Sequence, residues 1–104
     1  MKEDLEHIIQ HYGIRNQLKK FNEETYELIE AVNDYERQKE ACENIGCSRI
    51  HADKELEHIV EEYADVCVIL EQFKAYYNLD NDKIINMMKF KIDRQLERIN
   101  NENK

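Results

Sequence analysis

The sequence predicts an all-helical protein, and three observations support this expectation. The chain of 104 residues has no proline and only two glycines, Gly13 and Gly46, so it has few of the residues on which turns between strands depend. Charged residues make up 37% and hydrophobic residues 41%, a balance typical of helices with one polar and one apolar face. Apolar side chains recur every three or four residues over long stretches. A chain of this length can fill one core, so we expect a single domain over residues 1–104 with its core in 13–99.

A short first helix is expected from Glu3 to Gln10, ending at Gly13, because glycine readily ends a helix. A long helix should follow, in which steps of four and three residues separate the apolar positions and place them on one face. These positions are Ile14, Leu18, Phe21, Thr25, Leu28, Val32 and Tyr35.

A second long helix carries a matching stripe. Its members are Leu56, Ile59, Tyr63, Val66, Leu70, Phe73 and Tyr77. Two long helices with matching stripes are expected to pack side by side. Between them, residues 40–51 contain Gly46 and no sustained periodicity, and we expect a loop there.

The last helix should begin after Asp80, with Asp80 or Asn81 as its N-terminal cap. Its apolar positions are Ile85, Met88, Ile92, Leu96 and Ile99. The tail from Asn100 to Lys104 should fray. The expected architecture is a bundle of one short and three long helices.

Each of the first two long helices carries a pair of acidic residues three positions apart. The first pair is Glu24 and Glu27, and the second is Glu62 and Asp65. Residues three apart lie on the same side of a helix, one turn from each other. All four directly precede a residue of an apolar stripe, so we expect them to border the buried seam. If the helices pack seam to seam, the four carboxylates can converge. A single acidic pair is common on solvated helix faces, so the prediction depends on the presence of two matching pairs.

Four neighbouring carboxylates would repel one another unless cations lay among them. Ligation by carboxylates favours Mg²⁺, with Mn²⁺ as an alternative, over zinc or copper. Mg²⁺ usually keeps some water and takes further oxygens from phosphates. The predicted site is therefore suited to a nucleotide polyphosphate.

The paired motif resembles the signature of the MazG-like all-α nucleotide pyrophosphohydrolases, in which ExxE on one long helix is followed by ExxD on the next. Glu24 to Leu28 and Glu62 to Val66 match the two halves. Gly13 to Leu18 and Lys89 to Gln95 look like small phage and bacterial members, and the resemblance covers roughly residues 13–99.

The resemblance implies a MazG-like fold and hydrolysis of a nucleoside triphosphate, often a deoxynucleotide, to the monophosphate and pyrophosphate. The metal ligands and catalytic residues that it implies are Glu24, Glu27, Glu62 and Asp65. Which carboxylate accepts the proton of the attacking water stays open.

Positive side chains are also needed to hold the phosphates. Lys20 lies four residues before Glu24, on the same helix face. Lys89 and Arg94 lie on the last helix, where the family tends to place a lysine followed by asparagine and arginine. Each can equally be an ordinary surface cation. Gln17 could contact a base through its amide.

Two features depart from the family pattern. Residues 40–51 make the stretch between the motifs longer than is usual, which should leave the site intact. Asp93 stands where many members carry asparagine, and its charge could alter phosphate or sugar contacts.

The formal net charge of −8 argues against a nucleic acid or an anionic membrane as the main partner. No apolar run approaches the roughly 20 residues of a membrane span, and the N-terminus lacks a signal-peptide core. We therefore expect a cytoplasmic protein with reduced thiols.

Cys42, Cys47 and His51 have a spacing that could bind zinc, although a fourth ligand is not evident.

The apolar stripes are too long for one small chain to cover, so a homodimer or homotetramer is expected.

Two other protein classes stay open. A catalytically inactive or regulatory helical oligomerisation module would carry the acidic residues for solubility alone, and metals would not change its stability. A di-iron carboxylate bundle needs two Glu-x-x-His motifs, of which Glu55 to His58 supplies one. The preferred base and sugar are not determined.

Overall fold

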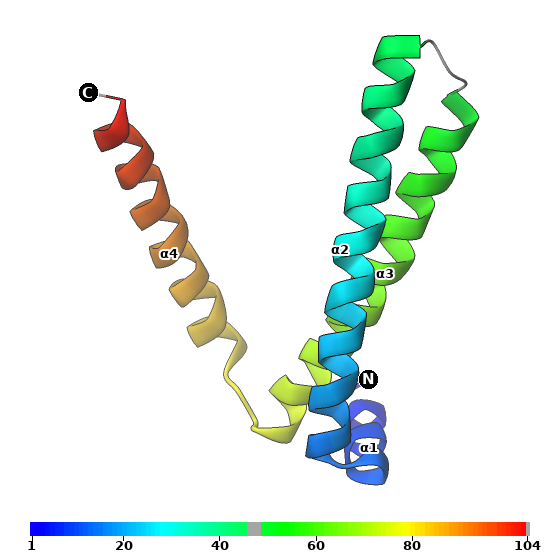
Figure 1. Ribbon diagram of the computed structural model, residues 1–104. Coiled ribbons are helices and arrows are strands. Elements are labelled where there is room, and N and C mark those ends of the chain that lie inside the picture. The colour runs from blue at the N-terminus through cyan, green and yellow to red at the C-terminus, as the bar shows by residue number, and fades with distance from the viewer. Residues whose placement is uncertain (46–48, 104) are drawn as a thin grey trace.

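The computed structural model describes residues 1–45 and 49–103, and this part of the chain contains four helices and no strand (Figure 1). The helices are α1 (Lys2–Tyr12), α2 (Ile14–Ile45), α3 (Arg49–Tyr76) and α4 (Asn81–Glu102). The prediction of an all-α protein with one short and three long helices is confirmed. Among the described residues, no helix combines the length and the apolar character that crossing a bilayer requires.

Two helix ends follow the sequence signals. Gly13 ends α1 with a φ of +87°, a backbone conformation that favours glycine, and its N–H donates to the Ile9 carbonyl at 2.8 Å. Asp80 caps α4, because its side chain accepts a hydrogen bond from the Asp82 N–H at 2.9 Å. The predicted stop at Gly13 and the predicted cap at Asp80 are both confirmed.

The predicted loop and the predicted frayed tail are wrong over most of their length. Residues 40–45 continue α2 and residues 49–51 belong to α3, while residues 46–48 lie outside the described part of the chain. Asn100 to Glu102 continue α4. Residues with good helix propensity, such as Glu40 and Ala41, extend a helix by local hydrogen bonding without an apolar face.

Of the two described cysteines, one keeps the expected free thiol and one does not. Cys42 is disulfide-bonded, so it offers no thiolate to the possible zinc site. Cys67 is a free and partly buried thiol. The side chains of Cys47 and His51 lie outside the described ones, so only the part of the zinc hypothesis that concerns these two residues stays a prediction.

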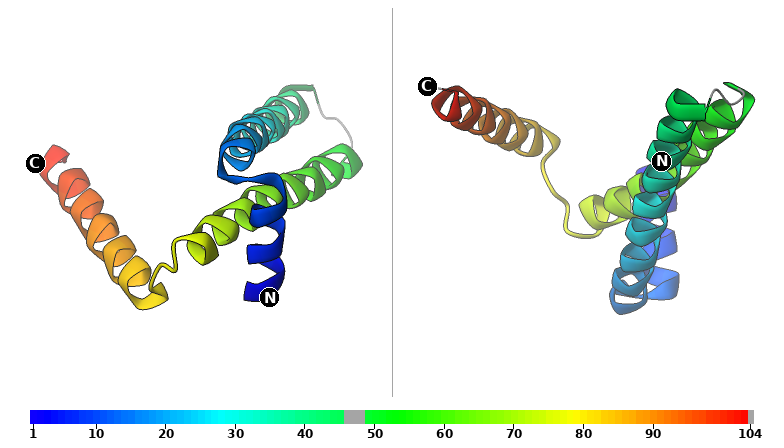
Figure 2. Two further views of the ribbon diagram at one scale, coloured as in Figure 1. Left: turned by 90° about the horizontal axis from the view of Figure 1, so that it is seen from below. Right: turned by 45° about the horizontal axis from the view of Figure 1, so that its top comes forward.

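Helices α2 and α3 form an antiparallel pair, and α1 folds back at Gly13 to pack against α3 and, less extensively, α2 (Figures 1 and 2). The fully or nearly fully buried apolar side chains of this three-helix unit are Ile9, Ala31, Ile69 and Ala75. Phe21 and Phe73 meet edge to face across α2 and α3, with their ring centroids 5.7 Å apart.

The buried seam between α2 and α3 is offset by about one residue from the predicted stripes. On α2, the most buried side chains are Gln17, Glu24 and Ala31, which are spaced seven residues apart. By contrast, the stripe residues Leu18 and Tyr63 are 48% and 61% exposed. Glu24, which was expected to border the seam, therefore lies inside it, whereas Glu27 is exposed, and part of each apolar stripe stays exposed.

Helix α4 stands apart from the rest of the described chain and packs against none of the other three helices (Figures 1 and 2). Its apolar positions, including Ile92 and Leu96, are exposed. The helix therefore carries an apolar face that the described part of this chain does not cover.

Candidate functional site

Three of the four predicted metal ligands come together between α2 and α3. Glu24 on α2, with Glu62 and Asp65 on α3, each offer one carboxylate oxygen, and these oxygens all lie within 4.8 Å of one another. Glu27 is exposed and is not part of this cluster, although its carboxylate lies close enough to interact with that of Glu24. The expected convergence of acidic residues is thus present for three of the four side chains. We call these three residues the carboxylate triad.

Two members of the triad have the same arrangement of contacts. Glu24 is 8% exposed; its Oε1 lies 3.5 Å from the Lys20 Nζ, and its buried Oε2 has no hydrogen-bond partner. Glu62 is partly buried; its Oε1 lies 3.3 Å from the His58 Nε2, and its buried Oε2 also lacks a partner. Leaving a buried carboxylate oxygen without a partner is unfavourable. These two oxygens therefore mark a place where a cation would be stabilising.

The electrostatics of the triad point the same way. Burial raises the pKa of the Glu24 carboxyl, and the negative charge of Glu27, a hydrogen bond with Glu27 and the charge of Asp65 raise it further. The hydrogen bond with Lys20 opposes the increase. Negative charge is therefore disfavoured at Glu24, and a bound divalent cation would offset the same repulsion.

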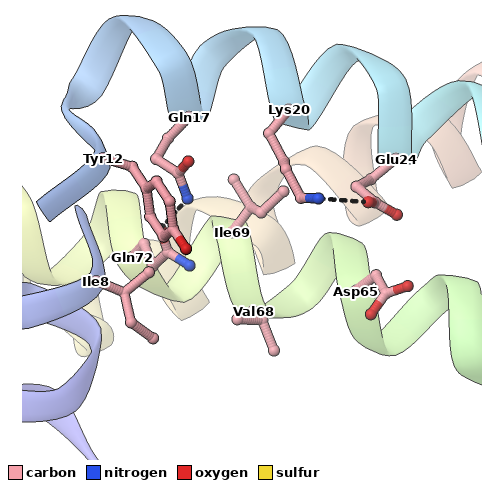
Figure 3. Close-up of a pocket in the computed structure, with 9 residues that line it drawn as sticks. All are labelled: Ile8, Tyr12, Gln17, Lys20, Glu24, Asp65, Val68, Ile69 and Gln72. Carbon is pink, nitrogen blue, oxygen red and sulfur yellow. Dashed lines mark hydrogen bonds and ion pairs between the residues drawn. The ribbon is translucent and has the colours of Figure 1, made fainter.

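A cavity of about 490 Å³ adjoins the triad (Figure 3). Glu24 and Asp65 line one end, where Lys20 reaches across to Glu24. Gln17 and Gln72 line the other end. Tyr12, Ile8, Val68 and Ile69 complete the lining. The cavity therefore joins a charged end to an uncharged polar end along an apolar wall.

The two glutamines at the uncharged end are joined to each other. Gln17 is 5% exposed and Gln72 is 3% exposed, and the Gln17 Nε2 donates a hydrogen bond to the Gln72 Oε1 at 2.7 Å. The sequence prediction named Gln17 but missed Gln72. A signal existed: Gln17 lies seven residues before Glu24, and Gln72 lies seven residues after Asp65. In antiparallel helices these two steps run in the same direction, so both glutamines reach the same end of the pair.

The four predicted substrate-binding residues are divided between two parts of the molecule. Gln17 and Lys20 line the cavity. Lys89 and Arg94 lie on α4, which does not pack against the helices that carry the triad. Within the described part of one chain, these two cations are therefore not brought to the site.

Comparison of the chain with protein-family models, with curated proteins and with solved structures gives no match. The resemblance to MazG-like proteins therefore depends on the sequence motifs and stays a prediction.

Proposed function

We propose that this protein is a magnesium-dependent nucleoside triphosphate pyrophosphohydrolase, which cleaves a ribo- or deoxyribonucleoside triphosphate to the monophosphate and pyrophosphate. The observation that carries the proposal is the carboxylate triad, with its two unpartnered buried oxygens, at one end of a cavity that also contains a lysine. A cavity with a cation-binding end and an uncharged end suits a ligand that has charged phosphates at one end and an uncharged group at the other, such as a nucleotide.

The residues present fit a hard divalent cation. Mg²⁺ and Mn²⁺ prefer carboxylate and phosphate oxygens, and the triad offers only oxygen ligands. Glu24, Glu62 and Asp65 would hold the ion, and Glu27 lies near enough to influence the Glu24 carboxyl. When bound, such an ion neutralises phosphate oxygens and helps to orient the reacting groups.

The side chains around the triad supply the other requirements of the reaction. Lys20, whose side chain is 56% exposed, can leave Glu24 and bind a phosphate oxygen once a cation satisfies the carboxylate. Glu27 is an exposed carboxylate beside the triad, so we assign it as the group that accepts the proton of the attacking water.

A homodimer or homotetramer is part of the proposal. Helix α4 has an uncovered apolar face and contains five of the 15 Lys and Arg residues of the chain, but only four of its 23 Asp and Glu residues. A second copy could cover this face and bring the cations of α4, Lys89 and Arg94 included, to the acidic region formed by α2 and α3. Charge complementarity between α4 and the rest of the chain supports this arrangement.

The proposed reaction is tested by incubating the protein with a panel of nucleoside triphosphates and Mg²⁺ in ¹⁸O-labelled water. We expect the monophosphate and pyrophosphate as first products, with the labelled oxygen in the monophosphate. Asp65→Asn should lower kcat by orders of magnitude, because it removes one charged ligand of the triad. Asp53→Asn, an exposed position on the same helix, is the matched control.

Release of orthophosphate as a first product, or full activity in Asp65→Asn, would contradict the proposal. No hydrolysis of any triphosphate, together with no effect of Mg²⁺ on stability, would instead favour the inactive or regulatory oligomerisation module.

A further inference from the structure

We infer that the Gln17–Gln72 pair is the base-recognition element of the site and that Gln72 is a specificity-determining residue. The inference rests on the proposed function, because it takes the ligand of the cavity to be a nucleotide. The chemical group recognised is a planar ring edge that presents a hydrogen-bond donor beside an acceptor, as a nucleobase does.

The pair has hydrogen-bonding capacity that the described part of the chain does not use. Each primary amide offers two N–H donors and one carbonyl oxygen. The 2.7 Å bond uses one N–H of Gln17 and one acceptor site of Gln72, and neither side chain makes another hydrogen bond among the described residues. The Gln17 carbonyl oxygen and the Gln72 amino group are therefore available to a ligand. Neither atom belongs to the fully buried unpartnered atoms of the described chain, so both are accessible from the cavity that the two residues line.

The conclusion does not depend on which way the amides are turned. The oxygen and nitrogen of a carboxamide can exchange places if both partners exchange together. In either arrangement one glutamine presents an acceptor and the other presents a donor. The pair therefore always matches an edge with one donor and one acceptor side by side.

The distance between the two ends of the cavity agrees with the length of a nucleotide. Seven residues separate Gln17 from Glu24, and seven separate Asp65 from Gln72, which corresponds to about 10 Å along each helix. Figure 3 shows the glutamines and the carboxylates at opposite ends of the same wall. Val68 and Ile69 lie between them, and Tyr12 lies beside the glutamines, so apolar and aromatic surface is present for a planar ring.

The opposite orientation of a nucleotide is disfavoured by charge. It would place the triphosphate against two uncharged amides and the base against the carboxylates of Glu24 and Asp65. In the described structure Lys20 is the cation that lines the cavity, and it lies at the carboxylate end. Phosphates at that end and the base at the glutamine end therefore give the complementary arrangement.

The test compares two ligands by calorimetric titration with Mg²⁺. One is an α,β-imido deoxynucleoside triphosphate, which resists hydrolysis, and the other is the same triphosphate without a base. Gln72→Met should weaken binding of the base-bearing ligand about tenfold, the effect of losing a good bidentate contact to a base. It should leave binding of the base-free ligand unchanged. Gln10→Met, at an exposed position on α1 outside the cavity lining, should change neither Kd.

An equal loss for both ligands would mean that Gln72 only joins the helices, and no loss for either would remove it from the site. Both results would overturn the inference. Because binding is measured without turnover, these outcomes are distinct from a failure of the proposed hydrolysis. Base-dependent binding without hydrolysis of any triphosphate would overturn the proposed reaction but would still support base recognition by the Gln17–Gln72 pair.

A second variant tests the same inference if Gln72→Met proves poorly folded. Gln72→Glu, ionised at neutral or higher pH, converts the pair from one donor and one acceptor to two acceptors. Guanine presents two neighbouring donors on its edge, so the variant should shift the Kd ratio toward guanine by about tenfold relative to the other bases. An unchanged ratio in a folded variant would overturn the inference.

Discussion

Neutralising Glu24 should stabilise the protein when no metal is present, and at the same time abolish its response to Mg²⁺. Glu24 is nearly buried, its Oε2 has no partner, and its nearest acidic neighbours repel it. Glu24→Gln keeps the shape of the side chain and removes its charge. The substitution should therefore raise the melting temperature in EDTA, although it removes the ion pair with Lys20.

The expected magnitude follows from the separation of the carboxylates. Two unit charges 4.8 Å apart repel by about 0.9 kcal/mol at the dielectric constant of water and by about 3.5 kcal/mol at an effective value of about 20. Glu24→Gln removes two of the three repulsive pairs in the triad. Solvent around the exposed Asp65 reduces this gain, and the lost ion pair with the largely exposed Lys20 offsets up to about 1 kcal/mol of it. A net gain of about 1–3 kcal/mol should raise Tm by at least roughly 4 °C in a chain of this size.

In EDTA the variant Glu24→Gln should have the higher Tm, and in Mg²⁺ the wild type should have the higher Tm. At a Mg²⁺ concentration of about 100 times Kd, a ligand that binds only the folded state adds about 2.7 kcal/mol of stability. Wild type should gain this stabilisation and Glu24→Gln should not, because the variant lacks one of the three ligands.

The assay is thermal unfolding followed by circular dichroism at fixed protein concentration, in EDTA and in Mg²⁺. Glu23→Gln is the matched control, since Glu23 is an exposed neighbour on the same helix, and it should leave both Tm values close to wild type. A lower Tm for Glu24→Gln in EDTA, or an undiminished Mg²⁺ response in that variant, would refute the reasoning.

Two further predictions concern pH and assembly. Because the folded-state pKa of Glu24 is raised above that of the unfolded chain, this group favours folding at low pH and opposes it as pH rises through the folded pKa. The Mg²⁺-induced rise in Tm should therefore shrink as pH is lowered from neutral, and melts that show a larger rise at lower pH would contradict this. Sedimentation should show a homodimer or homotetramer for wild type and a smaller species for Ile92→Glu, which places a charge on the uncovered apolar face of α4. Asn101→Glu, at an exposed position on the opposite side of α4, is the control, and a monomeric wild type at micromolar concentration would rule out the proposed assembly.

The helical character of this protein was determined by the sequence, because helices form through contacts between residues three and four apart. The absence of proline and the spacing of the apolar residues favour helices whatever the tertiary arrangement. The stop at Gly13 and the cap at Asp80 are likewise local, since each depends on backbone groups within four residues. The two acidic pairs could be recognised for the same reason, as each lies within one turn of its helix.

The composition of the site was decided only by the tertiary structure. A rotation of a helix by one residue position, about 100°, determines whether a stripe residue or the residue before it faces the neighbouring helix. The packing of α2 on α3 places Glu24 and Gln17 in the seam, leaves Glu27 outside the triad and brings Gln72 to Gln17. Such a rotation depends on how the side chains of two helices fit together, and the periodicity of either sequence alone does not contain that information. The sequence also does not determine that α4 lies apart from the other three helices. The apolar stripe of α4 indicates that the helix packs against some surface, but it does not identify that surface.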